Sequence, residues 1–177
     1  AFIRAWSILI SKHLEGVEVD HVIFSYHGVP QKTIKRSDAA GVCTFGDCCN
    51  DITAENRYCY RAQCVATTES IIAALGWNEV SHSVAFQSRF GPLPWVQPYL
   101  DEHILELVGK GVNRLAVITP SFVSDCLETI HEIGVKYQHQ FKAAGGETFL
   151  LLPNLNDDQD WFDAVFEISH KHLTSQD

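Results

Sequence analysis

The sequence predicts an α/β domain with three layers, a Rossmann-like arrangement in which helices flank a four-stranded parallel sheet. Four short apolar runs alternate with longer segments of helical periodicity along the chain. Strands that alternate with helices favour parallel pairing through right-handed crossovers. A length of 177 residues, with 46% hydrophobic and 20% charged residues, suits one domain with a full core. We therefore expect residues 1–177 to form a single domain.

The first half of the chain predicts two helices, two strands and one long loop. A helix is expected at 1–14, with Phe2, Trp6, Leu9 and Ile10 on one face, and a strand at 21–25 follows it. Residues 31–56 are polar, rich in Asp and Cys, and without helical or strand period, which predicts a loop. After the loop we expect a helix at 57–75, which stops at Gly76, and a strand at 79–86.

The second half continues this alternation. We expect helices at 95–107, 125–143 and 158–173, and strands at 114–119 and 148–152. Ser124 or Asp125 is available to cap the 125–143 helix, which stops at two glycines. No Gly-x-Gly-x-x-Gly follows any of the strands, so the pattern gives no sign of a dinucleotide site.

Charge and hydropathy exclude several classes of protein. No run approaches the roughly 18 to 20 apolar residues of a membrane-spanning helix. The net charge of -9, without a basic cluster, argues against a nucleic-acid partner and against binding an anionic membrane by charge alone. A negative surface attracts divalent cations instead. The chain also has no methionine and no signal-peptide pattern, so we expect it to be part of a longer protein.

Two strand ends carry side chains suited to chemistry. His27 follows the apolar run at 21–24 and precedes Gly28, Val29 and Pro30. Glu128 follows the 114–119 strand and falls on the first turn of the next helix. Ligands bind at the carboxyl ends of strands in open α/β sheets, so both residues lie where a site is expected. A base and a carboxylate there suit proton removal or cation delivery, and periodicity alone leaves both open.

Three motifs follow one another along the chain: SYHGVP at 25–30, FQSRFGPLPWVQPYL at 86–100 and PSFVSDCLETI at 120–130. In this order they resemble the C-terminal half of the ferrochelatases, the enzymes that insert ferrous iron into protoporphyrin IX to make haem, and the resemblance spans about 19–153. It implies a chelatase-like fold, with residues 1–177 as the second half of a two-domain enzyme that supplies one wall of a porphyrin cleft. The implied partners are protoporphyrin IX, ferrous iron and the N-terminal half, without which this half is expected to be inactive. The implied location is the cytoplasm, peripheral to the inner membrane.

The resemblance also assigns roles to individual side chains. His27 matches the family's histidine for proton abstraction or metal binding, which suits an imidazole because it changes charge near neutral pH. Glu128 matches its cleft glutamate, and Glu132, four residues on, the next acid of a row that binds metal. Lys136 then stands where many relatives have another acid. The structural alternatives are a histidine that caps a strand end and two acids favoured by the helix dipole.

The middle motif and the start of the third are expected to touch the porphyrin. Stiff Gly-Pro-x-Pro geometry beside an indole suits contact with a flat ring, although Trp95 and Phe122 are equally suited to the protein core. The implied porphyrin-binding residues are Ser88, Arg89, Gly91, Pro92, Trp95 and Phe122.

Five of the six cysteines lie within a Cys-rich loop at about 31–64. The candidates are Cys43, Cys48, Cys49, Cys59 and Cys64. Crowding of this kind without a secretory signal favours a metal centre over disulfides. Some bacterial ferrochelatases resemble the chain in carrying a [2Fe–2S] cluster here, and a zinc site or free thiols are the alternatives. Cys48 and Cys49 compete for one ligand place, Cys64 is the least secure ligand, and we expect the loop to be ordered only around a metal centre.

Two other functions remain open from the sequence. One is a cobalt or nickel chelatase for another tetrapyrrole, although Cys126 stands where such enzymes favour a second histidine. The other is an iron–sulfur redox or sensing module without catalysis, which explains the cysteines but not the SYHG and SDCLE motifs.

Overall fold

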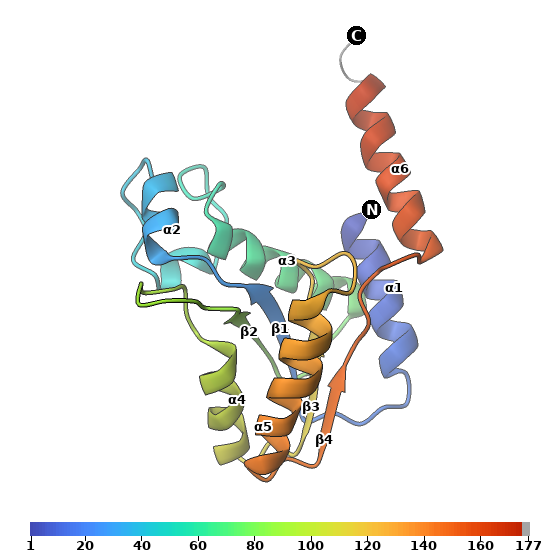
Figure 1. Cartoon of the computed structure of the whole chain (residues 1–177). Helices are drawn as coiled ribbons and strands as arrows, with labels where there is room; N and C mark the ends of the chain where they lie inside the picture. The colour runs from blue at the N-terminus through green and yellow to red at the C-terminus, as the bar shows by residue number, and fades with distance from the viewer. Residues whose placement is uncertain (175–177) are drawn as a thin grey trace.

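The computed structural model of the chain describes residues 1–174 and contains one four-stranded, all-parallel sheet. The strand order is β2-β1-β3-β4, so β1 and β3 lie at the centre (Figure 1). The predicted three-layer α/β fold is therefore confirmed. The strands are β1 (His21–His27), β2 (His82–Gln87), β3 (Arg114–Ile118) and β4 (Thr148–Leu151).

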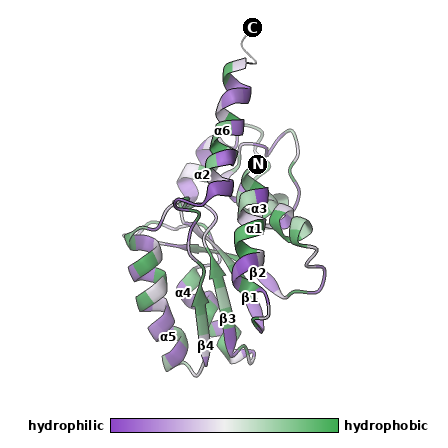
Figure 2. Ribbon diagram, turned by 90° about the vertical axis from the view of Figure 1, so that its right-hand side faces the viewer, coloured by the Kyte–Doolittle hydropathy of each residue, from purple (hydrophilic) through white to green (hydrophobic). Residues whose placement is uncertain are grey.

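Helices cover both faces of the sheet because successive strand residues point to opposite sides. Phe24 of β1 packs with Trp6 and Ile71 on one face, whereas Ile23 packs with Ile104 and Ile133 on the other. Figure 2 shows hydrophobic residues along the strands. The helices are α1 (Phe2–Leu14), α2 (Gln31–Ser37), α3 (Tyr60–Leu75), α4 (Leu100–Gly109), α5 (Gln138–Ala143) and α6 (Gln159–Thr174), with a 3-10 turn η1 (Asp47–Cys49) and a π-helix η2 (Glu128–Tyr137).

The structure corrects three predicted elements. The expected loop at 31–56 contains α2, a short helix anchored by the buried side chain of Ile34. The helix expected at 95–107 begins only at Leu100, because Trp95 in the preceding segment forms a bridge to Pro30. The helix expected at 125–143 begins as η2 at 128 and becomes α-helical only at 138, and no side chain caps it.

No helix within residues 1–174 is long and apolar enough to cross a bilayer.

A buried histidine lies at the edge of the sheet remote from His27. His21 Nδ1 lies 2.7 Å from Ser81 Oγ and its Nε2 lies 2.8 Å from Ser83 Oγ, which in turn lies 2.8 Å from His103 Nε2. Burial, followed by repulsion from His103, His82 and Lys110, lowers the pKa of His21 to about 4. The neutral ring is therefore the form that the folded state holds.

This geometry predicts a pH-dependent loss of stability. The folded pKa of His21 is below the unfolded value of 6.5, so its contribution is full above pH 6.5 and is lost as the pH falls towards 4. The loss attributable to His21 is up to about 3 kcal/mol. Urea unfolding of the wild type and His21→Gln at pH 7, 5.5 and 4.5 measures it. We expect the two free energies of unfolding to converge at low pH, and a gap that does not change with pH would contradict this account.

Candidate active site

The carboxyl ends of the parallel strands meet at one edge of the sheet, and the candidate residues collect there. His27 is the last residue of β1, and Gln87 is the last residue of β2. The segment that follows β3 leads to Glu128 at the start of η2. Because β1 pairs with both β2 and β3, the three strand ends are neighbours, as the sequence predicts for this edge.

The backbone around His27 fixes the orientation and tautomer of its ring. His27 Nδ1 lies 2.6 Å from the carbonyl oxygen of Gly28. A carbonyl can only accept, so Nδ1 carries the proton and the neutral ring presents its lone pair at Nε2. The backbone of His27 is itself held, because its N–H donates to Ser121 Oγ at 3.2 Å and its carbonyl accepts from Tyr60 OH at 2.8 Å. The half-buried ring is thus held in one orientation, with Nε2 left available.

Glu128 begins the π-helix and is electrostatically linked to His27. A hydrogen bond from the side chain of Cys126 lowers the pKa of Glu128, its own backbone N–H adds to this, and attraction to His27 contributes further. The carboxylate therefore stays ionised to a lower pH than usual. π-Helical turns are rare and are often found at functional sites, because they project side chains differently from an α-helix.

Gln87 joins the ends of β1 and β2 to the π-helix. Its buried side chain accepts a hydrogen bond from Ser25 Oγ at 2.8 Å and donates one from Nε2 to the carbonyl of Glu128 at 3.1 Å. Its own carbonyl accepts from Gly28 N at 2.8 Å. Gln87 thus holds the backbone of Glu128 and the residue that follows His27 in place.

Glu132 is held by three protein donors. Ser88 donates to its carboxylate from Oγ at 2.5 Å and from the backbone N–H at 3.1 Å, and Tyr137 OH donates at 2.9 Å. Ser88 has a φ of 64°, in the left-handed region that a non-glycine residue adopts only with support. The carboxylate also raises the pKa of Tyr137, second to the effect of burial. In this arrangement Glu132 holds the start of the 88–95 loop.

The aromatic and the basic side chain of the 88–95 loop point to different parts of the structure. The half-buried Trp95 donates from Nε1 to the carbonyl of Phe90 at 2.9 Å, and its ring lies against Gly28. Arg89 instead faces α4, where it forms ion pairs with Asp101 at 2.8 Å and Glu102 at 2.9 Å. Gly91 and Pro92 lie on the exposed outer part of the loop.

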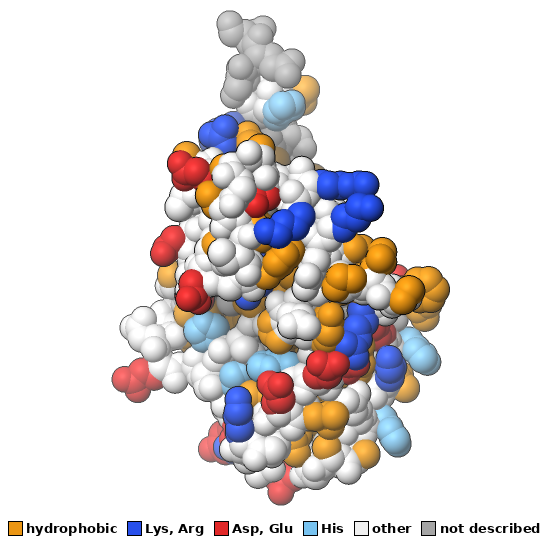
Figure 3. All heavy atoms as spheres, turned by 90° about the vertical axis from the view of Figure 1, so that its left-hand side faces the viewer, with side chains coloured by type: hydrophobic (Ala, Val, Ile, Leu, Met, Phe, Trp, Pro, Cys, Tyr) orange, Lys and Arg blue, Asp and Glu red, His pale blue; other side chains and the backbone are white. Residues whose placement is uncertain are grey.

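Exposed apolar side chains surround the same edge. Phe90 is 86% exposed and Leu93 is 56% exposed, and Figure 3 shows hydrophobic side chains gathered on the face that carries this loop. On the β3 side, the Phe122 ring centroid lies 6.1 Å from that of His27. The edge therefore offers an apolar wall beside a polar centre.

Asp125, which the sequence suggested as a helix cap, instead binds the segment after β4. Its carboxylate accepts from Asn154 Nδ2 at 3.0 Å and from Asn156 Nδ2 at 2.8 Å. Thr119 Oγ1 donates to Asn154 Oδ1 at 2.6 Å. These bonds fix the path of the chain into η2, and so the place of Glu128.

A family profile for ferrochelatase matches residues 1–173. The chain belongs to the ferrochelatase family. It is 39% identical over 173 residues to the ferrochelatase of Coxiella burnetii, which covers 97% of the chain and 49% of that relative. It is 43% identical over 153 residues to the ferrochelatase of Legionella pneumophila strain Lens, which covers 86% of the chain and 46% of that relative. The chain thus spans about half the length of these curated ferrochelatases.

A solved structure shares the fold. A putative cobalamin (vitamin B12) biosynthesis CbiX protein from Marinobacter aquaeolei VT8 matches with a TM-score of 0.50 and 15% identity, over 88% of this chain and 98% of that one. At this identity the likeness supports the chelatase-like fold alone.

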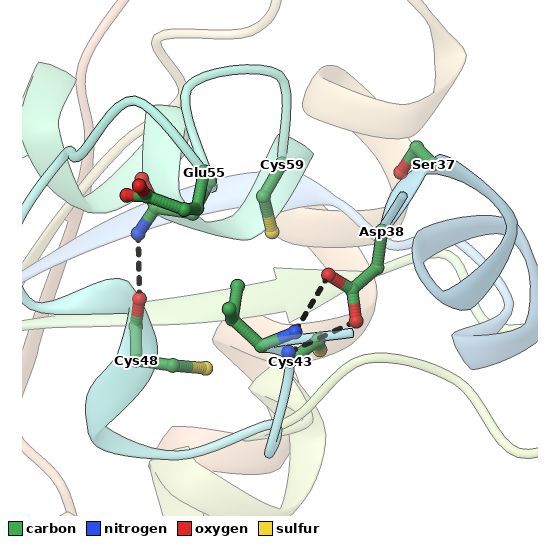
Figure 4. Close-up of a pocket in the computed structure, with 8 residues that line it drawn as sticks. Ser37, Asp38, Cys43, Cys48, Glu55 and Cys59 are labelled. Atoms are coloured by element: carbon green, nitrogen blue, oxygen red, sulfur yellow. Dashed lines mark hydrogen bonds between the residues drawn. The ribbon is translucent and has the colours of Figure 1, made fainter. Parts of the chain in front are cut away.

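Three of the five candidate cluster cysteines of this ferrochelatase-family chain line one pocket. Cys43, Cys48 and Cys59 line it together, and in Figure 4 the sulfurs of Cys48 and Cys59 point toward the same space. Cys49 Sγ lies 3.7 Å from Cys48 Sγ. Cys64 is buried inside α3, where burial raises the pKa of its thiol to about 12. Cys43 and Cys49 are buried as well, and burial also raises the pKa of their thiols, that of Cys49 to about 11.

Side chains from both ends of the loop shape this pocket. The Asp38 carboxylate accepts from the backbone N–H groups of Val42 at 3.0 Å and Cys43 at 2.9 Å. Asn56 Nδ2 donates to the carbonyl of Cys48 at 2.7 Å (Figure 4). Hydrogen bonds from the side chain and backbone of Thr44 lower the pKa of Cys48 to about 6. A thiol with that pKa is largely a thiolate at neutral pH.

The cysteines fit a [2Fe–2S] centre in number and chemistry, because such a centre needs four thiolates. They do not form a ready ligand set. Within residues 1–174, no three His, Cys, Asp or Glu side chains are placed to hold a metal ion, and the pocket volume of about 10 Å³ holds no more than one water molecule. The loop has to rearrange before it can hold a cluster.

Several residues that hold His27 and Glu128 in place were not predicted from the sequence. Gln87 and Ser25 have the pattern of ordinary strand residues, and Ser121 and Tyr60 that of loop and helix-start residues. Polar residues at the buried end of an apolar strand were the available signal for Gln87. The contacts of Ser121 and Tyr60 with His27 cross long stretches of sequence, so no local pattern reveals them.

Gly28 leaves no room for a side chain. A Cβ there would lie 2.8 Å from the Gln87 carbonyl oxygen, which is backbone, and 3.2 Å from the Trp95 ring. We expect Gly28→Ala to lower the free energy of unfolding by about 1–3 kcal/mol, because β1 and β2 must separate at this edge. Gly109→Ala is the matched control, since nothing lies within 4 Å of its Cβ. Urea unfolding tests both, and equal effects would contradict the close contact.

Glu132 should contribute to stability through Ser88. We expect Glu132→Gln to lower the free energy of unfolding by about 1.5–3 kcal/mol, because charge-assisted bonds to Ser88 and Tyr137 are weakened. The exposed Glu147 provides the control variant Glu147→Gln. Urea unfolding at pH 7 measures the difference, and a neutral effect at Glu132 would show that it does not support the loop.

Proposed function

We propose that this chain forms one wall of a cleft in which ferrous iron is inserted into protoporphyrin IX to form haem. The supporting observation is the arrangement of His27, whose ring presents Nε2 at the carboxyl edge of the sheet within electrostatic reach of Glu128. Membership of the ferrochelatase family supports metal insertion as the reaction at this edge of the sheet. Iron is a substrate of this reaction.

Metal insertion requires two pyrrole N–H protons to leave as the cation meets the four nitrogens of the ring. In our proposal His27 Nε2 accepts a proton, and the bond from Nδ1–H to the Gly28 carbonyl stabilises the imidazolium that results. Glu128, ionised because of its lowered pKa, ligates the entering iron or accepts the second proton. The products are haem and two protons.

The apolar wall would hold the porphyrin. Phe122 lies beside His27 and Trp95 lies against Gly28. Phe90 and Leu93 add exposed apolar surface. Ser88 is proposed to hold the loop in place with Glu132, and Gly91 and Pro92 to give the loop its shape. Arg89 is proposed to hold the loop against α4 through its ion pairs with that helix. Glu132 stays a candidate metal ligand only if its bonds to Ser88 open.

We further propose that Cys43, Cys48, Cys49 and Cys59 hold a [2Fe–2S] cluster after rearrangement of the loop. Three of these thiols already line one pocket and the fourth is adjacent. Cys64 is left out because it lies within α3 and is not among the residues that line the pocket. The cluster would tie the end of α2 to the start of α3, and the iron-insertion proposal does not depend on it.

Removal of the His27 imidazole tests the central assignment. In the full-length protein we expect His27→Ala to slow iron insertion by about 10²- to 10⁴-fold, the range for loss of a general base. Porphyrin affinity, measured by fluorescence quenching, should change by less than roughly 3-fold because the aromatic wall remains. The exposed His139 provides the control variant His139→Ala.

The same assay separates the alternatives. Turnover with Co²⁺ but not Fe²⁺ would favour the cobalt chelatase, and near-normal turnover in His27→Ala would remove the proposed base. We expect the 177-residue chain alone to give no turnover above the uncatalysed rate, because half a cleft cannot distort the porphyrin.

The cluster has its own spectroscopic test. Anaerobically purified full-length protein should be coloured, with charge-transfer absorption of the [2Fe–2S] type, and Cys59→Ser should abolish it. Cys126→Ser is the control, because Cys126 lies beside Glu128 and away from the pocket. Colourless protein that contains zinc would instead indicate a zinc site, and metal-free protein would indicate free thiols.

A further inference from the structure

Helix α6 carries an apolar surface that is not covered by the described part of the chain. Phe162, Val165, Phe166 and Leu173 share one side of the helix, and we call them the α6 stripe. Their exposed fractions are 54%, 40%, 70% and 73%. Phe166 and Leu173 also line a shallow groove of about 350 Å³ together with Ser169, His170 and Thr174. Exposed apolar groups this close together are typical of a binding surface.

Only the first turns of α6 pack against the domain. The Trp161 ring lies 6.0 Å from that of Phe2, and Ala164 is fully buried. Every residue from 165 to 174 is exposed. In Figure 1, α6 accordingly extends away from the body of the domain beyond α1. A helix of this length gains most of its stability from packing, so more than half of α6 lacks the contacts that usually maintain a helix.

We propose that the α6 stripe is the docking surface for the other half of the full-length ferrochelatase. The curated relatives are about twice as long as this chain, so a second half of comparable size lies outside the matched region. The N-terminus of the chain lies beside the base of α6 (Figure 1), in agreement with the contact of Phe2 with Trp161. A segment joined to Ala1 therefore starts next to the stripe.

The charges on α6 favour a protein partner over a membrane. The side of the helix away from the stripe carries three acids, Asp160, Asp163 and Glu167, and one base, Lys171. Helices that lie on anionic membranes instead carry Lys and Arg on their polar side. Docked against the other half, α6 would join the two walls of the proposed cleft. The docking does not depend on iron or porphyrin chemistry.

Amide hydrogen exchange, read by mass spectrometry, tests the proposal without any assay of activity. In the full-length protein we expect residues 162–174 to exchange at least tenfold more slowly than in the 177-residue chain. Phe166→Asp should remove most of that difference, whereas Glu167→Gln, on the opposite side of the helix, should leave it unchanged. The same two variants in the 177-residue chain report the intrinsic effect of each substitution on the helix.

Three results would overturn the assignment. One is equally fast exchange of α6 in the full-length protein and in the 177-residue chain. Another is exchange in the 177-residue chain that becomes slower as the protein concentration is raised, which would identify a second copy as the partner. The third is flotation of the 177-residue chain with anionic phospholipid vesicles, lost in Phe166→Asp, which would identify a membrane. Loss of iron insertion in His27→Ala bears on none of these, so the two proposals fail separately.

Discussion

The hydrogen bonds of Gln87 are the constraint on which the rest of the candidate site depends. This buried amide joins Ser25 in β1 to the first residue of the π-helix, while its backbone carbonyl binds the glycine that follows His27. Burial of an amide is costly unless each of its groups is paired. Two strand ends and a helix start are therefore held in one relative arrangement by a single residue.

The π-helix extends this arrangement to the aromatic loop. Its first turn provides Glu128, and its second provides Glu132, which binds Ser88 and Tyr137. Because Ser88 has a left-handed backbone conformation, the loop depends on those bonds to keep its path. The polar centre and the apolar wall are thus connected through one helix, so a shift of that helix would move both.

The sequence predicted the parallel sheet because each strand is a short apolar run, and it placed His27 and Glu128 at the correct edge because both follow such runs. It failed where tertiary contacts outweigh local pattern. The segment at 95–99 has helical composition but bridges to Pro30, and Asp125 binds the loop after β4 rather than the helix start. The crowding of the cysteines indicated a shared site, but it did not indicate which of them line one pocket, since spacing does not describe how a loop folds back.

The proton on the His27 ring is directed by a partner that is only one residue away. Many histidines at active sites are oriented by a carboxylate from elsewhere in the fold, and their tautomer then changes when that distant segment changes. Here the acceptor is the carbonyl of the next peptide unit. The ring and the group that orients it therefore belong to one short piece of backbone, so substitutions in the surrounding walls can change the shape of this edge without changing which ring nitrogen carries the proton.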